Sequence, residues 1–521
     1  MEFKIIPQPS EITVFSSESA FFFSDETQIS CPDEFSRALD DLVLFSQKVF
    51  SINLPGGGKE KIVFSKSDEI KNKEGYKISV KNNNIFIFAS DGAGAFYAVQ
   101  TLKQLLLQGK NNLPEMEIFD LPQCAWRGFM LDSARYFFSV EAVKLFLDSM
   151  ALHKLNCFHW HLTDDQGWRI ELYNKLLLAQ IGSHRSCTNF GKIPHEGYYS
   201  KEDIEEIISY ASEKYISIIP EIDSPGHVVS AIAAYPELSC FNRELEVETK
   251  WGIKNDVLCV GKEETYDFMF EILDEVCEMF PSKIIHIGGD EVPTVRWKLC
   301  PHCQKKMKEL GFENESQLHG YYLSRIASYL EKKGFLVIMW DSKNLDHSVS
   351  KSVIRQFWSS DEAGRIESRG DFKLINSSTD AFYLDYPYGH TNLKKCYEAE
   401  INLYSDNCLG GEACLWTEYV PSMKKAGYCL FPRLAAFSER VWCKRENLSY
   451  ENFVSKIPQY EKLLDTLPFD YASMKQAMPS FFRKHGYNLW FERRRLHWGS
   501  LHNTIDNFKV KKLSKKEKTN D

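Results

Sequence analysis

The sequence predicts an α/β fold centred on a (β/α)8 TIM barrel, with a small α+β domain before it and a mostly helical extension after it. Eight short apolar segments, rich in β-branched and aromatic residues, alternate with longer amphipathic segments over about 310 residues. Short runs of alternating polarity precede this region, and helical, polar segments follow it. The chain has 521 residues, 43% of them hydrophobic, which is enough for a barrel and an added domain.

The first 122 residues form the expected α+β domain. Apolar and polar residues alternate in several short runs that Gly and Asn punctuate. The expected strands are residues 61–65, 76–80 and 84–90. Residues 94–108 are apolar at helical spacing and predict a helix. The two prolines of residues 113–123 lead us to interpret that segment as the connector out of this domain.

Residues 123–445 form the expected barrel. Its strands are predicted at residues 127–132, 155–162, 216–222, 283–289, 335–340, 353–358, 372–378 and 408–416. Helices are predicted between them at residues 140–154, 201–215, 264–280 and 316–334. In such barrels the chemistry lies at the carboxyl ends of the strands, so the residues that follow each apolar run are expected to share one mouth.

Residues 446–521 form the expected helical extension, which ends in a Lys-rich tail. Six lysines fall between Lys509 and Lys518. We interpret them as a solvated chain end, with attraction to a polyanion or a membrane surface as the alternative.

Charge and composition exclude some classes of partner. The net charge of −9 is unfavourable for wholesale binding to nucleic acid, and no apolar run is long enough to span a bilayer. The first residues show no secretory leader, so we expect a cytoplasmic protein, or else a secreted one whose leader has been removed. Several of the 14 cysteines lie in apolar runs, which favours a reducing compartment. Nothing in the sequence indicates an oligomeric state.

The residues at the predicted strand ends are mostly carboxylates, histidines and aromatics. They are Asp132, Arg135, His161, Asp164, Asp165, Glu221, Asp223, His227, Asp290, Glu291, Trp340, Asp341, Trp358, Tyr383, Asp385, Trp416 and Glu418. Carboxylic acids supply the acid and base for glycosidic cleavage, and aromatic faces stack on the apolar face of a sugar ring. This combination is typical of a glycosidase.

The segment HIGGDEVP, residues 286–293, is the most informative motif. Two glycines allow a tight turn at the end of a strand, and the adjacent Asp290 and Glu291 then point in different directions. Two carboxylates can therefore perform two tasks on one substrate. Taken alone, such a pair more often marks the start of a helix.

Other residues suggest alternatives. His159, His161 and His227 would suit a metal-dependent barrel hydrolase, and a non-catalytic sugar-binding protein is a third hypothesis. The segment CPHC, Cys300–Cys303, could be half of a zinc site. No second CxxC lies nearby, so we favour a structural thiol pair or no role.

Seven motifs together resemble glycoside hydrolase family 20, the β-N-acetylhexosaminidases. They are RGFMLDSARYF, KLNCFHWHLTDDQGWRIE, IPEIDSPGH, HIGGDEVP, VIMWD, QFW and GGEACLWTE, which stand in the family's order between residues 126 and 440. The preceding region resembles the small domain that often accompanies this barrel. The resemblance implies retaining hydrolysis of terminal β-linked GlcNAc or GalNAc, with the substrate's own 2-acetamido oxygen as the nucleophile and no cofactor or metal.

The resemblance also implies roles for individual residues. Glu291 matches the general acid/base, and Asp290 matches the residue that orients the acetamido group and stabilises the oxazolinium intermediate. Asp164, Asp223 and His227 match a polar network behind the acid/base. The implied sugar contacts are Arg135, Asp385 and Glu418 to hydroxyls, Tyr383 to the acetamide oxygen, and Trp340, Trp358 and Trp416 as aromatic walls. The implied partner is an oligosaccharide or glycoconjugate that ends in a β-N-acetylhexosamine.

Overall fold

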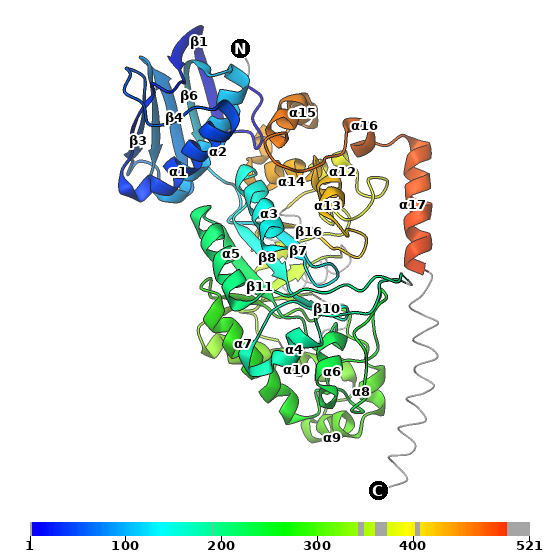
Figure 1. Cartoon of the computed structure of the whole chain (residues 1–521). Helices are drawn as coiled ribbons and strands as arrows, with labels where there is room; N and C mark the ends of the chain where they lie inside the picture. Colours follow the sequence, from blue (N-terminus) through cyan, green and yellow to red (C-terminus); the bar gives the residue numbers. More distant parts are fainter. Residues whose placement is uncertain (1–2, 190, 342–348, 360–371, 402–406, 497–521) are drawn as a thin grey trace.

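The fold was established from a computed structural model (Figure 1). It describes residues 3–189, 191–341, 349–359, 372–401 and 407–496. The chain forms a six-stranded sheet with two helices, then a closed barrel of eight parallel strands, then helices that lie against the barrel. The predicted fold class is confirmed.

The N-terminal sheet is mixed, with strand order β1-β6-β4-β5-β3-β2. Its strands are β1 Glu11–Phe22, β2 Gln28–Ser30, β3 Lys61–Lys66, β4 Tyr76–Lys81, β5 Asn84–Ala89 and β6 Asn112–Asp120. Helices α1 (Ser36–Phe45) and α2 (Gly92–Gly109) pack against one face (Figure 1). Asp91 caps α2 by accepting a hydrogen bond from the backbone of Ala93, which fixes where the predicted helix begins.

Our interpretation of residues 113–123 as a connector was wrong, because most of that segment is strand β6. It lies between β1 and β4. Pro114 is accommodated because it faces Ser19, where the register of β1 shifts, and the pairing of β6 with β4 begins only at Met116. A proline has no N–H to donate, and here no partner strand requires one.

The barrel closes in the order β7-β8-β11-β12-β13-β14-β15-β16, with all neighbours parallel. The strands are β7 Trp126–Asp132, β8 Cys157–His161, β11 Ser217–Glu221, β12 Ile284–His286, β13 Leu336–Trp340, β14 Ile354–Phe357, β15 Leu374–Asn376 and β16 Cys408–Leu415. Each falls inside, or within one residue of, a predicted strand. Strands buried on both faces have nearly continuous apolar sequences, which is why these eight could be found.

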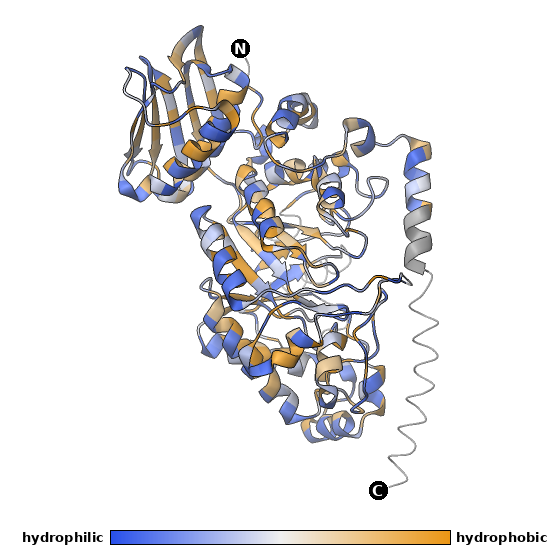
Figure 2. Ribbon diagram, viewed as in Figure 1, coloured by the Kyte–Doolittle hydropathy of each residue, from blue (hydrophilic) through white to orange (hydrophobic). Residues whose placement is uncertain are grey.

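Helices cover the outside of the barrel. Five of them are α3 Val140–Leu152, α5 Lys201–Glu213, α7 Glu263–Met279, α10 Glu315–Lys332 and α14 Arg433–Trp442. Further helices of ten residues or fewer are α4 Leu176–Gln180, α6 Val229–Ala234, α8 Val295–Leu299, α9 Pro301–Leu310, α12 Leu393–Glu398 and α13 Met423–Leu430. Capping boxes at Ser200 and Asn314 start α5 and α10. Hydrophobic residues of the strands and of the surrounding helices form one continuous buried core, and Figure 2 shows both hydrophobic and hydrophilic positions along these helices.

The C-terminal extension is helical, as predicted, over its described part. It comprises α15 Tyr450–Leu464, α16 Met474–Ala477 and α17 Phe481–Leu496. The Lys-rich tail lies outside the described residues. Within the described ranges, no helix combines the length and the apolar character needed to cross a membrane.

The first domain and the barrel share a buried contact. Lys154, just before β8, lies with its amino group 2.9 Å from the carboxylate of Asp120 at the end of β6, and both side chains are fully buried. The indole of Trp442 in α14 donates to the same carboxylate at 3.0 Å. Trp442 and Ala151 also belong to the apolar core of the first domain, so the two units pack as one body.

Candidate active site

The turn after β12 positions the two adjacent carboxylates. Gly288 and Gly289 have positive φ angles of 65° and 102°. The carboxylate of Asp223, in the loop after β11, accepts a hydrogen bond of 2.9 Å from the backbone of Gly289. A Cβ atom at Gly288 would lie 1.7 Å from Asp223 Oδ1. The glycines of the motif are therefore required both by the turn and by this close approach.

Asp290 is a carboxylate with an unused acceptor. Its Oδ1 is buried and has no hydrogen-bond partner among the described residues. Burial, together with the charges of Glu291 and Glu221, outweighs the attraction of His227 and raises the pKa of Asp290 to about 6. A buried acceptor left unpaired is costly, so this oxygen is suited to a donor that a substrate would bring.

Glu291 lies in different surroundings from Asp290. Its side chain is 35% exposed, and Oε2 lies 3.6 Å from Nε2 of His227. Nδ1 of His227 lies 3.3 Å from Asp164 and 3.5 Å from Asp165. Burial disfavours a charged imidazole, but these carboxylates outweigh it and raise the pKa of His227 well above its ordinary value. His227 therefore lies between Glu291 and Asp164, so that the three side chains form a chain of contacts.

Arg135 forms an ion pair with Asp164, at the end of this chain away from Glu291. Its guanidinium lies 2.7 Å from Asp164, and the same carboxylate lies 3.1 Å from His161. Burial opposes ionisation of Asp164, but Arg135 and His227 overcome it and hold the pKa of Asp164 well below its ordinary value. Asp223, also predicted in this network, has a carboxylate oxygen within 4.8 Å of a ring nitrogen of His227 and of an Asp290 oxygen, and it accepts a hydrogen bond from the Gly289 backbone. Burial and the charge of Asp290 raise the pKa of Asp223 well above its ordinary value.

The predicted aromatic residues gather at one side of the mouth. Trp340, Tyr383, Trp358 and Trp416 belong to one cluster, whose base is Met130 and Cys414. The ring centroid of Trp416 lies 5.8 Å from that of Trp340 and 6.0 Å from that of Tyr383. Nε1 of Trp416 is buried and without a partner among the described residues. The cluster offers ring faces together with a free N–H, which suits a sugar.

Asp385 and Glu418 are two further carboxylates of the predicted site, and the charge of Glu418 acts on Asp385. Burial and then the charge of Glu418 raise the pKa of Asp385 well above its ordinary value, and Oδ1 of Asp385 has no partner in the described part of the chain. Burial raises the pKa of Glu418 as well, against the opposing charge of Arg135. All twelve predicted site residues thus lie in loops or strand ends at the same end of the barrel.

A buried polar layer beneath the mouth was not predicted. Glu221, at the end of β11, accepts hydrogen bonds from Trp340 Nε1 at 2.6 Å and His161 Nδ1 at 2.5 Å, and His286 Nδ1 lies 3.1 Å away. Glu412, in β16, lies 2.7 Å from His159 Nδ1. Glu221 was predicted among the strand-end residues. Its hydrogen bond with Trp340 could not be predicted, because the two residues are 119 positions apart in the chain.

The alternative metal site does not assemble. Among the described residues, the histidine-containing groups that could hold an ion place His159 with Glu221 and His286, and His227 either with Asp164 and Asp165 or with Asp223 and Asp290. No group there contains His159, His161 and His227 together. Both imidazole nitrogens of His159 instead face carboxylates, Glu412 on one side and Glu221 on the other.

Comparison with known proteins agrees with this geometry. Residues 124–445 match the model of the glycosyl hydrolase family 20 catalytic domain, and residues 2–121 match glycosyl hydrolase family 20, domain 2. A beta-hexosaminidase of Porphyromonas gingivalis is 33% identical over 488 residues, which are 87% of this chain and 62% of that protein. A beta-hexosaminidase of Akkermansia muciniphila is 30% identical, over 78% of this chain and 87% of that protein.

Comparison with solved structures indicates the same family. The fold matches a GH20 exo-β-N-acetylglucosaminidase from Vibrio harveyi with a TM-score of 0.82 and 29% identity, over 90% of this chain and 78% of that one. A β-N-acetylhexosaminidase from Bacteroides fragilis matches with a TM-score of 0.77 and 29% identity, over 92% and 99%. The resemblance predicted from the motifs is thereby confirmed, and with both characteristic domains matched in order this chain belongs to glycosyl hydrolase family 20.

Proposed function

We propose that this protein is an exo-acting β-N-acetylhexosaminidase that removes terminal β-linked GlcNAc or GalNAc with retention of configuration. The observation that carries the proposal is the contrast between Asp290 and Glu291. One is a buried carboxylate with an unused acceptor beside an aromatic cluster, and the other is a half-exposed carboxylate against a charged histidine. Substrate-assisted cleavage needs one carboxylate of each kind.

In the first step, the acetamido oxygen of the sugar attacks the anomeric carbon while the glycosidic bond breaks. The carboxyl group of Glu291 gives its proton to the departing oxygen. Asp290 accepts a hydrogen bond from the acetamido N–H and stabilises the positive charge of the resulting oxazolinium ring. Burial raises the pKa of Tyr383 well above its ordinary value, so its hydroxyl keeps its proton and can donate to the acetamide oxygen.

In the second step, a water molecule attacks the anomeric carbon from the side that the leaving group vacated. The carboxylate of Glu291 now takes a proton from that water, and the oxazolinium ring opens to restore the acetamido group. Two inversions give overall retention. The Asp164–His227 chain holds Glu291 in place through both steps, and Arg135 is placed to bind sugar hydroxyls.

The test compares aryl β-glycosides of GlcNAc and GalNAc with the matching β-glucoside, which lacks the acetamide. We expect hydrolysis of at least one of the first two and negligible hydrolysis of the glucoside. Proton NMR of the earliest product should show the β-anomer. Comparable rates on the glucoside, or an α-anomer as first product, would sink the substrate-assisted mechanism. A panel of disaccharides then defines the natural linkage.

We also propose that the protein works in a reducing compartment such as the cytoplasm. The support is the setting of the cysteines: ten of the 14 are buried, where a free thiol packs as a small apolar side chain. Fractionation of source cells followed by immunodetection tests this, and recovery in the secreted fraction would contradict it.

A further inference from the structure

Four cysteines outside the catalytic mouth converge on one point. They are Cys240, Cys259, Cys300 and Cys303, and all are buried. The Sγ–Sγ distances are 3.6 Å for Cys259–Cys300, 3.8 Å for Cys259–Cys303 and 3.9 Å for Cys240–Cys303, and all four sulfurs lie within 4.8 Å of one another. The two sulfurs that CPHC lacks are thus supplied by residues 41 and more positions earlier in the chain.

These distances suit a metal tetrahedron. Zinc binds thiolate sulfur at about 2.3 Å, so four sulfurs at the corners of a tetrahedron around it are about 3.8 Å apart. A disulfide requires about 2.05 Å, and the geometry favours no single pair among the four. A free cysteine packs as a small apolar residue with only a weak S–H donor, so packing alone gives no reason for four of them to meet at one point.

The local backbone is also shaped for thiolates. Cys300 is the N-cap of α9 and Pro301 its first residue, so Cys300 lies at the positive end of a ten-residue helix. The backbone N–H of Cys303 donates to the sulfur of Cys300. Gly261, two residues after Cys259, lies so close to this turn that a Cβ atom there would be 2.4 Å from the backbone nitrogen of Cys303. The two halves of the cluster are therefore in direct backbone contact.

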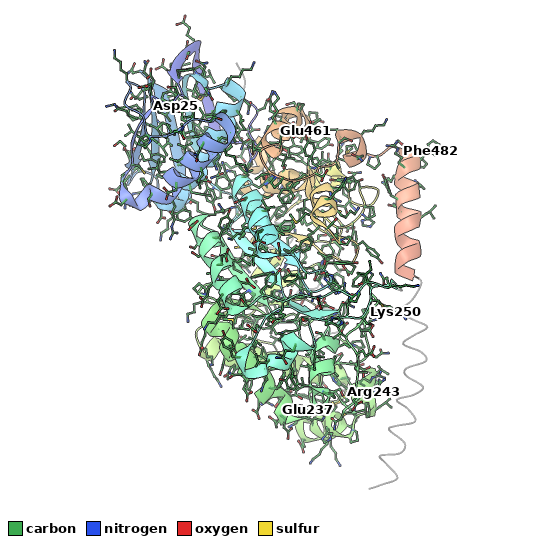
Figure 3. The ribbon with its side chains drawn as sticks, in the orientation of Figure 1. Asp25, Glu237, Arg243, Lys250, Glu461 and Phe482 are labelled. Carbon is green, nitrogen blue, oxygen red and sulfur yellow. The ribbon has the colours of Figure 1, made fainter. Side chains whose placement is uncertain are left out.

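The cluster joins two loops that also carry catalytic residues. Cys240 follows the short 3-10 helix Pro236–Leu238 in the loop after β11, and Cys300 follows α8 in the loop after β12. The backbone of Leu258 donates to Pro225, two residues before His227, and the Trp297 indole donates to Leu258. Figure 3 shows Glu237 and Arg243, which flank Cys240 in the chain, at the end of the barrel where α8 and α9 lie in Figure 1.

We propose that Cys240, Cys259, Cys300 and Cys303 bind one Zn²⁺ ion as a structural tetrathiolate site. Four protein ligands leave no position for water or substrate, so the ion takes no part in glycoside cleavage. It fastens the loop that carries His227 to the loop that carries Glu291. This proposal is independent of the substrate proposed above.

The first test is the metal content of the full-length protein, purified without a metal-affinity step and measured by inductively coupled plasma mass spectrometry. We expect one zinc per chain in the wild type and at least about a tenfold lower content in Cys300→Ser, which lacks one ligand. Cys396→Ser is the matched control, because Cys396 is equally buried but lies outside the cluster, and it should keep its zinc. Zinc-free wild type, or zinc retained in Cys300→Ser, would overturn the proposal.

A second measurement keeps the proposal testable if Cys300→Ser fails to fold. Wild-type protein expressed in cobalt-supplemented, zinc-depleted medium should show near-ultraviolet sulfur-to-cobalt charge transfer and the intense visible bands of tetrahedral cobalt. Weak octahedral bands, equimolar iron and sulfide, or an intact mass that shows disulfides among these four residues would each contradict the zinc assignment.

Discussion

His227 and Glu291 both have backbone conformations that non-glycine residues seldom adopt. Their φ angles are 53° and 47°, in the left-handed region. Each such residue carries a strain of about 1–3 kcal/mol, which persists only where the surroundings enforce it. Here the two strained residues meet, with their side chains 3.6 Å apart. The surroundings that enforce these conformations therefore also fix the directions of the Glu291 carboxylate and of the His227 imidazole.

Replacement of Asp290 by Asn should lower the activity and raise the thermal stability. Loss of the counter-charge to the oxazolinium ion should lower kcat on the order of 10²–10⁴-fold, with a smaller effect on KM. The melting temperature at pH 7 should rise, because the variant removes a buried negative charge. Kinetics and thermal melts over a pH series measure both.

The pH dependence of that gain follows from the pKa of Asp290. Because folding raises it from 3.8 to about 6, the folded protein binds the proton more tightly, and Asp290 costs stability increasingly as pH rises from about 4 to 6. The penalty is nearly complete above pH 6 and small at pH 4. The gain in melting temperature of the Asn variant should therefore be much smaller at pH 4 than at pH 7. A gain of equal size at both pH values would contradict this account.

Replacement of Glu291 by Gln should discriminate between leaving groups. Natural disaccharides need a proton on the departing oxygen, whereas an activated aryl leaving group needs little. The variant should therefore lose far more activity on disaccharides, on the order of 10²–10⁴-fold, than on activated aryl glycosides. Parallel assays on the two substrate types measure the ratio. Equal losses on both types would mean that another group is the general acid.

The sequence motifs were sufficient to place the candidate site residues at one end of the barrel, because each lies at the end of an apolar strand or in the loop that follows it. They were insufficient for the residues that support this site. Glu412 meets His159 across 253 positions, and only the closure of the barrel brings them together. The sequence predicted only the CPHC part of the sulfur cluster, for the same reason. Cys240 and Cys259 lie in loops without periodic signals, so nothing local connected them with CPHC.

Among the elements, the eight barrel strands could be predicted because each is a short apolar run buried on both sides. Strand β1 was missed. The centre of its sequence, EITVFSSESAFF, consists of three serines and one glutamate, and its pairing with β6 shifts register there. An irregular edge strand of this kind depends on its neighbour more than on its own pattern.

The turn after β12 gives a prediction for Gly288→Ala, which would place a Cβ atom 1.7 Å from Asp223 Oδ1. Asp223 would have to leave its bond to Gly289, and Asp290 would move with the turn. Displacements of about 1 Å in an active site lower rates on the order of 10²-fold, and we expect a loss in kcat of that size. Steady-state kinetics and thermal melts measure it.

Gly311→Ala is the control for backbone strain. Gly311 ends α9 with a φ of 69°, close to the 65° of Gly288, and no atom lies within 4 Å of a Cβ built there. The control should lose about 1 kcal/mol of stability with kcat unchanged. If both alanine variants behave alike, the close approach to Asp223 has no catalytic importance.

At the scale of the whole molecule, Asp120 joins the first domain to the barrel through Lys154 and Trp442. Lys154→Met should leave a buried charge without its partner and lower stability by about 3–5 kcal/mol. Chemical denaturation measures this loss. The kcat should stay at the wild-type value, because Lys154 lies at the amino end of β8 and the catalytic residues lie at the carboxyl ends of the strands.

The double variant Lys154→Met with Asp120→Asn tests the cause. Removal of both charges should recover part of the lost stability, since replacing a whole buried ion pair is often nearly neutral. A double variant as unstable as the single one would show that the packing of the lysine side chain, and not its charge, holds the two domains together.

The hydrogen bond from Trp340 to Glu221 has a consequence for how such an enzyme can diversify. The Trp340 indole, which we propose as a wall of the sugar site, donates a hydrogen bond to a carboxylate that also binds His161 inside the closed barrel. A mutation that reshapes this wall therefore disturbs the barrel interior and is selected against through stability. Mutations in the loops beyond the mouth carry no such penalty. Descendants of this protein can acquire new linkages and aglycones by drift in those loops while the sugar that they recognise stays the same.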